Sequence, residues 1–155
     1  MTTVTAIEAA LAAYAMDVAR QAQRDAETDA NKITLAVPDL FDLFAYPAPT
    51  DTLRLDGTFR QLQIGAEYSD GTECRTWFEK TRTVWNTLRP MVQGQAPSRP
   101  DITGAATVVA DVDSNLRATQ ALIGTDGGVM GNAVQLEAQA QDGLDQTDTC
   151  EQIFK

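Results

Sequence analysis

The clearest pattern of hydrophobic and polar positions lies in the middle of the chain, between Asp70 and Val92. Intervals of three and four residues place its apolar side chains along one side of a helix: Cys74, Trp77, Phe78, Val84, Trp85, Leu88 and Met91. Asp70 and Glu73 form the capping-box pattern of a helix start, and Pro90 predicts the end of the helix or a kink. We expect the core to form around this helix, because it holds both tryptophans.

A long first helix is predicted over residues 2–31. Its first half carries a seam of larger apolar residues that is typical of a helix packed against one or two others: Ile7, Leu11, Tyr14 and Val18. In the second half the seam continues only with small residues, Ala22, Ala26 and Ala30. Small side chains allow another helix to approach closely, so these alanines are a candidate interface. A solvated helix end is an equally good interpretation.

Two short segments follow. The run ITLAV at 33–37 predicts either a strand or an extended connector that stops at Pro38. Four apolar residues come next, too densely spaced for one helical stripe: Leu40, Phe41, Leu43 and Phe44. They either cover the core or fill a groove on a neighbouring subunit, and for the second role Phe41 and Phe44 are the candidate interface residues.

A short β-hairpin is predicted around Asp56-Gly57, because this dipeptide lies between two hydrophobic runs. The second run is ambiguous. Leu62 and Ile64 alternate as in a strand, whereas Phe59, Leu62 and Ala66 also have the spacing of a helix.

A break at 93–100, rich in glycine and proline, separates this half from the rest of the chain. It either divides two subdomains or is a flexible connection within one domain over 1–155. We favour the connection, because neither half shows a core of its own. Asp101 is then expected to cap a helix that ends at Ile123, before a glycine-rich loop.

A last helix is predicted from Val129 or Asn132 to Gln141, followed by a loosely ordered acidic tail at 143–155. Val129 and Met130 in the glycine-rich loop are further candidate interface residues, as are the tail residues Ile153 and Phe154. The expected fold is mainly α: three to four major helices packed as a bundle-like domain, with a short β-hairpin and long loops.

The net charge of −10 over 155 residues makes binding to nucleic acid or to an anionic membrane unfavourable. The arginines occur singly along the chain, so they form no basic patch. No apolar run reaches the roughly 18–20 residues of a membrane span, and no basic segment precedes the alanine-rich start. We therefore expect a protein made in the cytoplasm without a signal peptide.

The chain contains no histidine and only two cysteines, Cys74 and Cys150. This composition removes Ser-His-Asp and Cys-His catalysis and the usual zinc sites. We expect no cofactor, no metal and no enzymatic activity. The two cysteines either form a disulfide or stay reduced, and the place of Cys74 on the apolar stripe favours a buried thiol.

Three acidic or glycine-rich features of the sequence resemble parts of known calcium, phosphate and glycosidase sites. The run DVDSN at 111–115 starts like a calcium loop, but Leu116 and Leu122 stand where that loop needs glycine and glutamate. The sequence therefore leaves open only weak calcium binding at the surface. The glycine-rich loop at 124–132 has no strand before it and no lysine after it, so it does not predict a phosphate site. Pairs of carboxylates are inevitable among 22 acidic residues and so indicate no glycosidase.

The function predicted from these features is a non-catalytic structural or adaptor subunit of a larger protein assembly. A homo-oligomeric component of a virus or phage particle (capsid, neck or connector) fits best, with subunits of the same assembly as partners. The alternative is an acidic inhibitor or partner-binding protein that acts by charge complementarity. A small enzyme that uses carboxylates is the third hypothesis.

Overall fold

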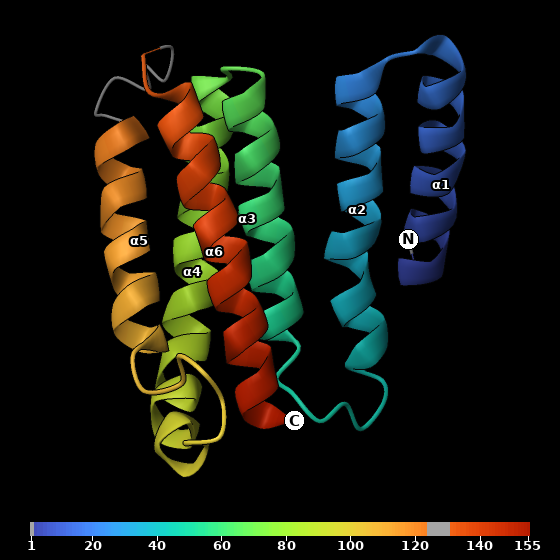
Figure 1. Cartoon of the computed structure of the whole chain (residues 1–155). Coiled ribbons are helices and arrows are strands. Elements are labelled where there is room, and N and C mark those ends of the chain that lie inside the picture. Colours follow the sequence, from blue (N-terminus) through green and yellow to red (C-terminus); the bar gives the residue numbers. More distant parts are fainter. Residues whose placement is uncertain (1, 124–130) are drawn as a thin grey trace.

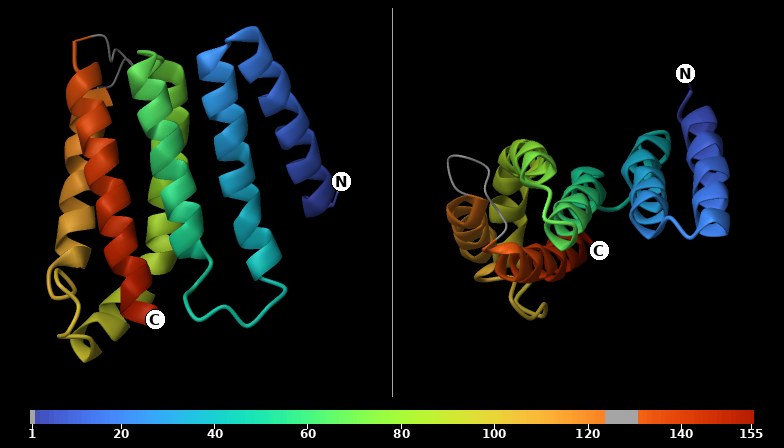
Figure 2. Two further views of the ribbon diagram at one scale, coloured as in Figure 1. Left: turned by 45° about the vertical axis from the view of Figure 1, so that its right-hand side comes forward. Right: turned by 90° about the horizontal axis from the view of Figure 1, so that it is seen from above.

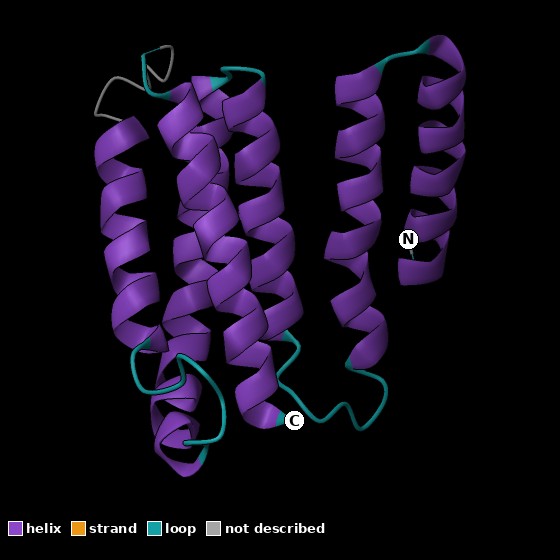
Figure 3. Ribbon diagram, in the orientation of Figure 1, coloured by secondary structure: helices purple, strands orange, loops and turns teal. Residues whose placement is uncertain are grey.

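The computed structural model describes residues 2–123 and 131–155, and every regular element in these residues is helical (Figure 3). The prediction of a mainly α protein is confirmed, with six α-helices in place of three or four. They are α1 (Thr3–Arg20), α2 (Gln23–Phe41), α3 (Asp51–Glu67), α4 (Gly71–Gln95), α5 (Val108–Ile123) and α6 (Ala133–Phe154), with a short 3-10 helix, η1 (Ala96–Ser98), after α4.

Helices α3, α4, α5 and α6 form a bundle, and α2 and α1 extend from it as two further layers (Figures 1 and 2). α3 lies at the centre, because it packs extensively against α2, α4 and α6. α2 lies beside α3, and α1 lies on the far side of α2, at the edge of the molecule. The chain therefore has a compact end with a continuous core and a thinner end made of two helices.

The predicted β-hairpin around Asp56-Gly57 is wrong, since both residues lie inside α3. α3 is buried on most of its circumference, including Leu55, Phe59, Leu62 and Ile64. A helix covered on several sides loses the simple one-sided stripe by which a helix is recognised. Gly57 serves close packing, not a turn: a Cβ atom added there would lie 2.7 Å from Leu35 Cδ2 on α2.

The long first helix predicted over 2–31 is also wrong, because the chain reverses at Gln21. This residue adopts a left-handed conformation with φ of 58°, and the Ala22 amide donates back to the Asp17 carbonyl oxygen. α1 and α2 are therefore an antiparallel hairpin. Residues 33–37, expected as a strand or connector, continue α2, which also passes through Pro38.

α4 is the predicted central helix, and its apolar stripe faces the core except at Met91, which is 39% exposed. Cys74, Phe78, Trp85 and Leu88 are buried. The Asp70 carboxylate caps the helix by accepting from the Glu73 amide at 3.0 Å. The helix does not end near Pro90 but continues to Gln95.

The carboxylate of Glu73 does not close the capping box. It accepts instead from Arg24 of α2 at 2.7 Å and from Gln61 of α3 at 2.8 Å. Arg24 also donates to Asp70 at 2.6 Å. These bonds tie the start of α2 to the start of α4, across the end of α3.

The C-terminal half differs from its prediction at two helix ends. α5 begins at Val108, whereas Asp101 lies in the preceding turns and pairs with Arg99. α6 includes most of 143–155, where an acidic tail was expected, and its Leu144, Cys150 and Ile153 are buried. These three residues meet the core because α6 packs along both α3 and α5.

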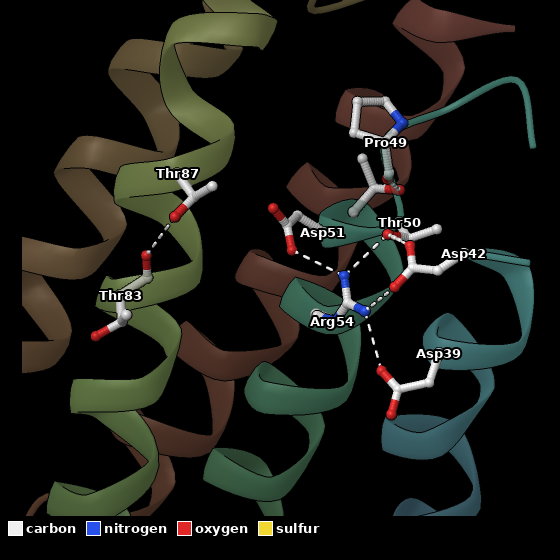
Figure 4. Close-up of polar contacts among 9 residues, drawn as sticks. Asp39, Asp42, Pro49, Thr50, Asp51, Arg54, Thr83 and Thr87 are labelled. Atoms are coloured by element: carbon white, nitrogen blue, oxygen red, sulfur yellow. Dashed lines mark hydrogen bonds and ion pairs between the residues drawn. The ribbon is translucent and has the colours of Figure 1, made fainter. Parts of the chain in front are cut away.

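The connection between α2 and α3 is held by Arg54 of α3 (Figure 4). Its guanidinium lies 2.5 Å from Asp42, 3.0 Å from Asp39 and 3.1 Å from Asp51. The Thr50 hydroxyl and the Arg54 guanidinium both donate to Asp42 and hold the pKa of this carboxyl below its usual range. The arginine thus joins the end of α2 to the start of α3.

Candidate functional site

The side of α1 that faces α2 is made of small residues. Ala10 is buried, and Thr3, Ala6, Ala13 and Asp17 are half-buried at the same alternating spacing. α2 is the only described helix against which α1 packs extensively. Among the described residues, this contact therefore leaves most of the larger apolar side chains of α1 exposed to a large extent.

Those larger side chains form a second line along α1, which we call the α1 stripe: Val4, Ile7, Leu11, Tyr14 and Val18. At 3.6 residues per turn, it lies roughly 100° around the helix from the residues that face α2. The exposed fractions are 55% for Val4, 51% for Leu11, 40% for Tyr14 and 53% for Val18. The spacing alternates between three and four residues, as in a helix with a second helical partner.

The predicted alanine interface lies next to this stripe. Ala22, Ala26 and Ala30 line a groove of about 470 Å³ between α1 and α2, together with Tyr14 and Val18. Ala26 is buried, Ala22 is half-buried and Ala30 is exposed. The structure thus brings the three alanines together with the C-terminal half of the α1 stripe on one face of the hairpin.

Asp17 is an acidic residue of α1 that lines this groove and also lies on the side of α1 that faces α2. Burial raises its pKa, and Asp29 and Asp25 of α2 act in the same direction. Asp29 itself is buried and pairs with Lys32 at 2.5 Å. The hairpin therefore brings acidic groups together at its closed end.

The other predicted interface residues fall into three groups. Phe44 is 72% exposed in the turn after α2, whereas Phe41 is half-buried with its ring 4.6 Å from that of Tyr46. Ile153 is buried and Phe154 packs against the same core, so both contribute to the inside of the bundle. Val129 and Met130 lie outside the described residues.

Sequence reasoning recognised four members of the α1 stripe as the seam of a helix packed against one or two others, but did not name them as interface residues. Val4, one turn before Ile7, continues the same spacing and was missed. The periodicity itself was the signal. It predicts a partner helix without saying whether that partner belongs to the same chain.

The hairpin face has little chemistry beyond apolar contact. Across residues 2–123 and 131–155, no group of three or more His, Cys, Asp or Glu side chains could hold a metal ion. Cys74 and Cys150 are buried free thiols. In the part of the chain that the structure describes, no helix has the length and apolarity to cross a membrane.

The chain was also compared with known proteins. No protein-family model, curated protein or solved structure matches it.

Proposed function

We propose that this chain is a non-catalytic structural subunit that assembles with further copies of itself through α1. The observation that carries the proposal is the α1 stripe, a line of large apolar side chains, four of them 40% exposed or more. Among the described helices, α1 packs extensively only against α2. A contiguous apolar line of this kind on a water-facing helix marks an interaction site. A second copy offers a helix of the same length with the same spacing.

The charges around the stripe permit this contact. On the side away from α2 the stripe is bordered by Ala12, Ala15 and Ala19 and by one charged residue, Glu8, so like charges oppose each other there only where two Glu8 side chains meet. The whole chain, however, carries a net charge of −10, which opposes association at long range. Added salt screens that repulsion. Self-association should therefore strengthen with salt, whereas binding to a basic target by charge complementarity would weaken.

The apolar area of the α1 stripe sets the expected strength of self-association. α1 is 18 residues long, roughly 27 Å at 1.5 Å per residue. Burying the exposed half of an aliphatic side chain contributes roughly 1 kcal/mol, so one stripe contributes about 5 kcal/mol. Two stripes then compete with an association cost of roughly 4–15 kcal/mol. We expect assembly that depends on concentration in the micromolar to millimolar range.

The test is a double substitution, Leu11→Gln with Val18→Gln, in the full chain. Sedimentation equilibrium of the unmodified chain should show oligomers whose share rises with protein concentration and with salt. The double variant should stay monomeric and keep its unfolding midpoint, because both side chains are half exposed. Val134→Gln is the matched control, since Val134 is 77% exposed on α6, and it should assemble normally.

An unmodified chain that stays monomeric at every concentration and salt level would contradict the proposal. Equal loss of assembly in the Val134→Gln control would contradict the assignment to α1. The narrower expectation of a virus or phage particle component stays a prediction.

A further inference from the structure

A second groove lies between α2 and α3, next to the hairpin face. Its volume is about 540 Å³, and residues from both helices line it. Those used below are Glu27 and Asn31 of α2 and Asp56, Arg60, Ile64 and Glu67 of α3. With Ala30 and Gln63, which also line it, the groove combines three carboxylates, one guanidinium, two carboxamides and two apolar side chains.

Asn31 is the unusual member, because it is only 1% exposed and its Oδ1 atom is buried without a hydrogen-bond partner among the described residues. Its Nδ2 atom donates to the Gly57 carbonyl oxygen at 2.9 Å and to Gln61 Oε1 at 2.8 Å. A buried amide oxygen without a donor is costly, so such atoms are rare in folded proteins.

The orientation of the Asn31 amide is set by its neighbours. Gln61 must present its oxygen to Asn31, because its Nε2 atom donates to the Glu73 carboxylate at 2.8 Å. Glu73 is in turn held by Arg24 at 2.7 Å. A flipped Asn31 would place its oxygen against two other oxygens. The Asn31 Oδ1 atom is therefore left without a donor because of a chain of hydrogen bonds from Arg24 to Glu73, from Gln61 to Glu73 and from Asn31 to Gln61.

The charge of the groove is negative. Glu27, Asp56 and Glu67 face one cation, Arg60, whose guanidinium lies 3.7 Å from Asp56. Burial raises the pKa of Asp56, and burial together with Glu27 and Glu137 raises the pKa of Glu67. Both carboxylates are therefore in surroundings that would favour a further positive charge.

We propose that the α2–α3 groove binds a primary alkylammonium group, as carried by a linear diamine or polyamine or by a lysine side chain. An ammonium has three donors and no acceptor, which suits a groove lined by three carboxylates and by Asn31, whose amide oxygen has no donor. Ile64 and Ala30 supply apolar surface for the methylene chain that carries the ammonium. The site does not depend on the assembly proposed for α1.

The experiment is calorimetric titration of the full chain with putrescine, spermidine and Nα-acetyl-lysine methylamide at constant ionic strength. The side-chain amide signals of Asn31 in a nitrogen–proton correlation spectrum give a second readout. They should shift saturably with the amines and not with sodium or magnesium chloride at the same ionic strength. Binding of the lysine derivative as well would point to a partner's lysine, and binding of the diamines alone would point to free polyamines.

Glu67→Gln and Asp56→Asn should each weaken binding about tenfold, the loss of one charge-assisted contact. Asp111→Asn makes the same charge change on the exposed face of α5 and should leave the affinity unchanged. The proposal is overturned if no amine binds saturably, if magnesium competes at equal concentration, or if Asp111→Asn weakens binding as much as Glu67→Gln does.

Discussion

Gly143 of α6 lies directly against the ring of Phe59 on α3, so closely that a Cβ atom added at Gly143 would come within 2.4 Å of Phe59 Cε1. Phe59 is fully buried at the centre of the bundle. The ring therefore occupies the space that a side chain on α6 would need. Close approach of the two helices depends on this one missing methyl group.

Gly143→Ala should lower the free energy of unfolding by about 1–3 kcal/mol, because the buried ring must move out of its packed position. Urea unfolding followed by circular dichroism measures the change. Gly94→Ala is the control, since Gly94 lies inside α4 and nothing lies within 4 Å of an added Cβ atom. That variant should be unchanged or up to about 1 kcal/mol more stable, because alanine favours a helix. Equal effects of the two substitutions would contradict the packing described for Phe59.

Asp113 should make stability depend on pH. Its carboxylate accepts from Arg89 at 2.8 Å and from the indole Nε1 of Trp85 at 2.8 Å. The hydrogen bond from Arg89 is the main reason that the pKa of Asp113 is lowered. A lowered pKa in the folded state means that the contribution to stability is complete above the unfolded value of 3.8 and is lost as pH falls through the folded value.

Asp113→Asn should therefore cost about 1 kcal/mol at neutral pH, at the low end for charged hydrogen bonds because the pair is partly solvated. Its stability should also fall less steeply than that of the unmodified chain as the pH is lowered past the unfolded value of 3.8. Urea unfolding at neutral pH and below pH 3.8 provides the comparison. Asp111→Asn, two residues away and exposed, should follow the unmodified chain. If the unmodified chain, Asp113→Asn and Asp111→Asn all lost stability equally as the pH falls, Asp113 would not be the source of the pH dependence.

The two thiols should be unreactive in the folded protein. Cys74 and Cys150 are both fully buried, and burial raises the pKa of each to about 12. A disulfide reagent at mildly alkaline pH should titrate neither thiol in the native state and both in denaturant. Val134→Cys places a thiol at an exposed position and should react at once. Fewer than two native thiols in denaturant would show that Cys74 and Cys150 form a disulfide.

Helices were predictable where one face alone is buried. In α4 the stripe Cys74, Phe78, Trp85 and Leu88 faces the core, and Asp70 caps the helix as its position predicts. α3 was not predictable in the same way, because it is covered by three other helices and its apolar residues do not form one stripe. Its Asp56-Gly57 dipeptide carries a turn signal that close packing against Leu35 overrides.

The candidate site was predictable in part. The periodicity of Ile7, Leu11, Tyr14 and Val18 is visible in the sequence, and so are the small residues Ala22, Ala26 and Ala30. Their arrangement on one face depends on the reversal at Gln21, where a non-glycine residue adopts φ of 58°. Glutamine gives little local signal for that conformation, so a continuous helix was the reasonable prediction.

Composition and the spacing of apolar residues act locally along the chain. The amino-acid sequence was therefore enough to show that this protein is acidic and lacks histidine, and to predict that it is mainly helical. Which apolar residues find a partner depends on tertiary packing. α3 and α6 are covered on several sides, while the α1 stripe faces outward. Tertiary packing also leaves the Asn31 amide with a free oxygen, since Asn31 donates to Gln61 and Gln61 in turn donates to Glu73, both distant in the sequence. The spacing of apolar residues predicts that a helix packs against a partner, and only the packed structure shows whether that partner belongs to the same chain.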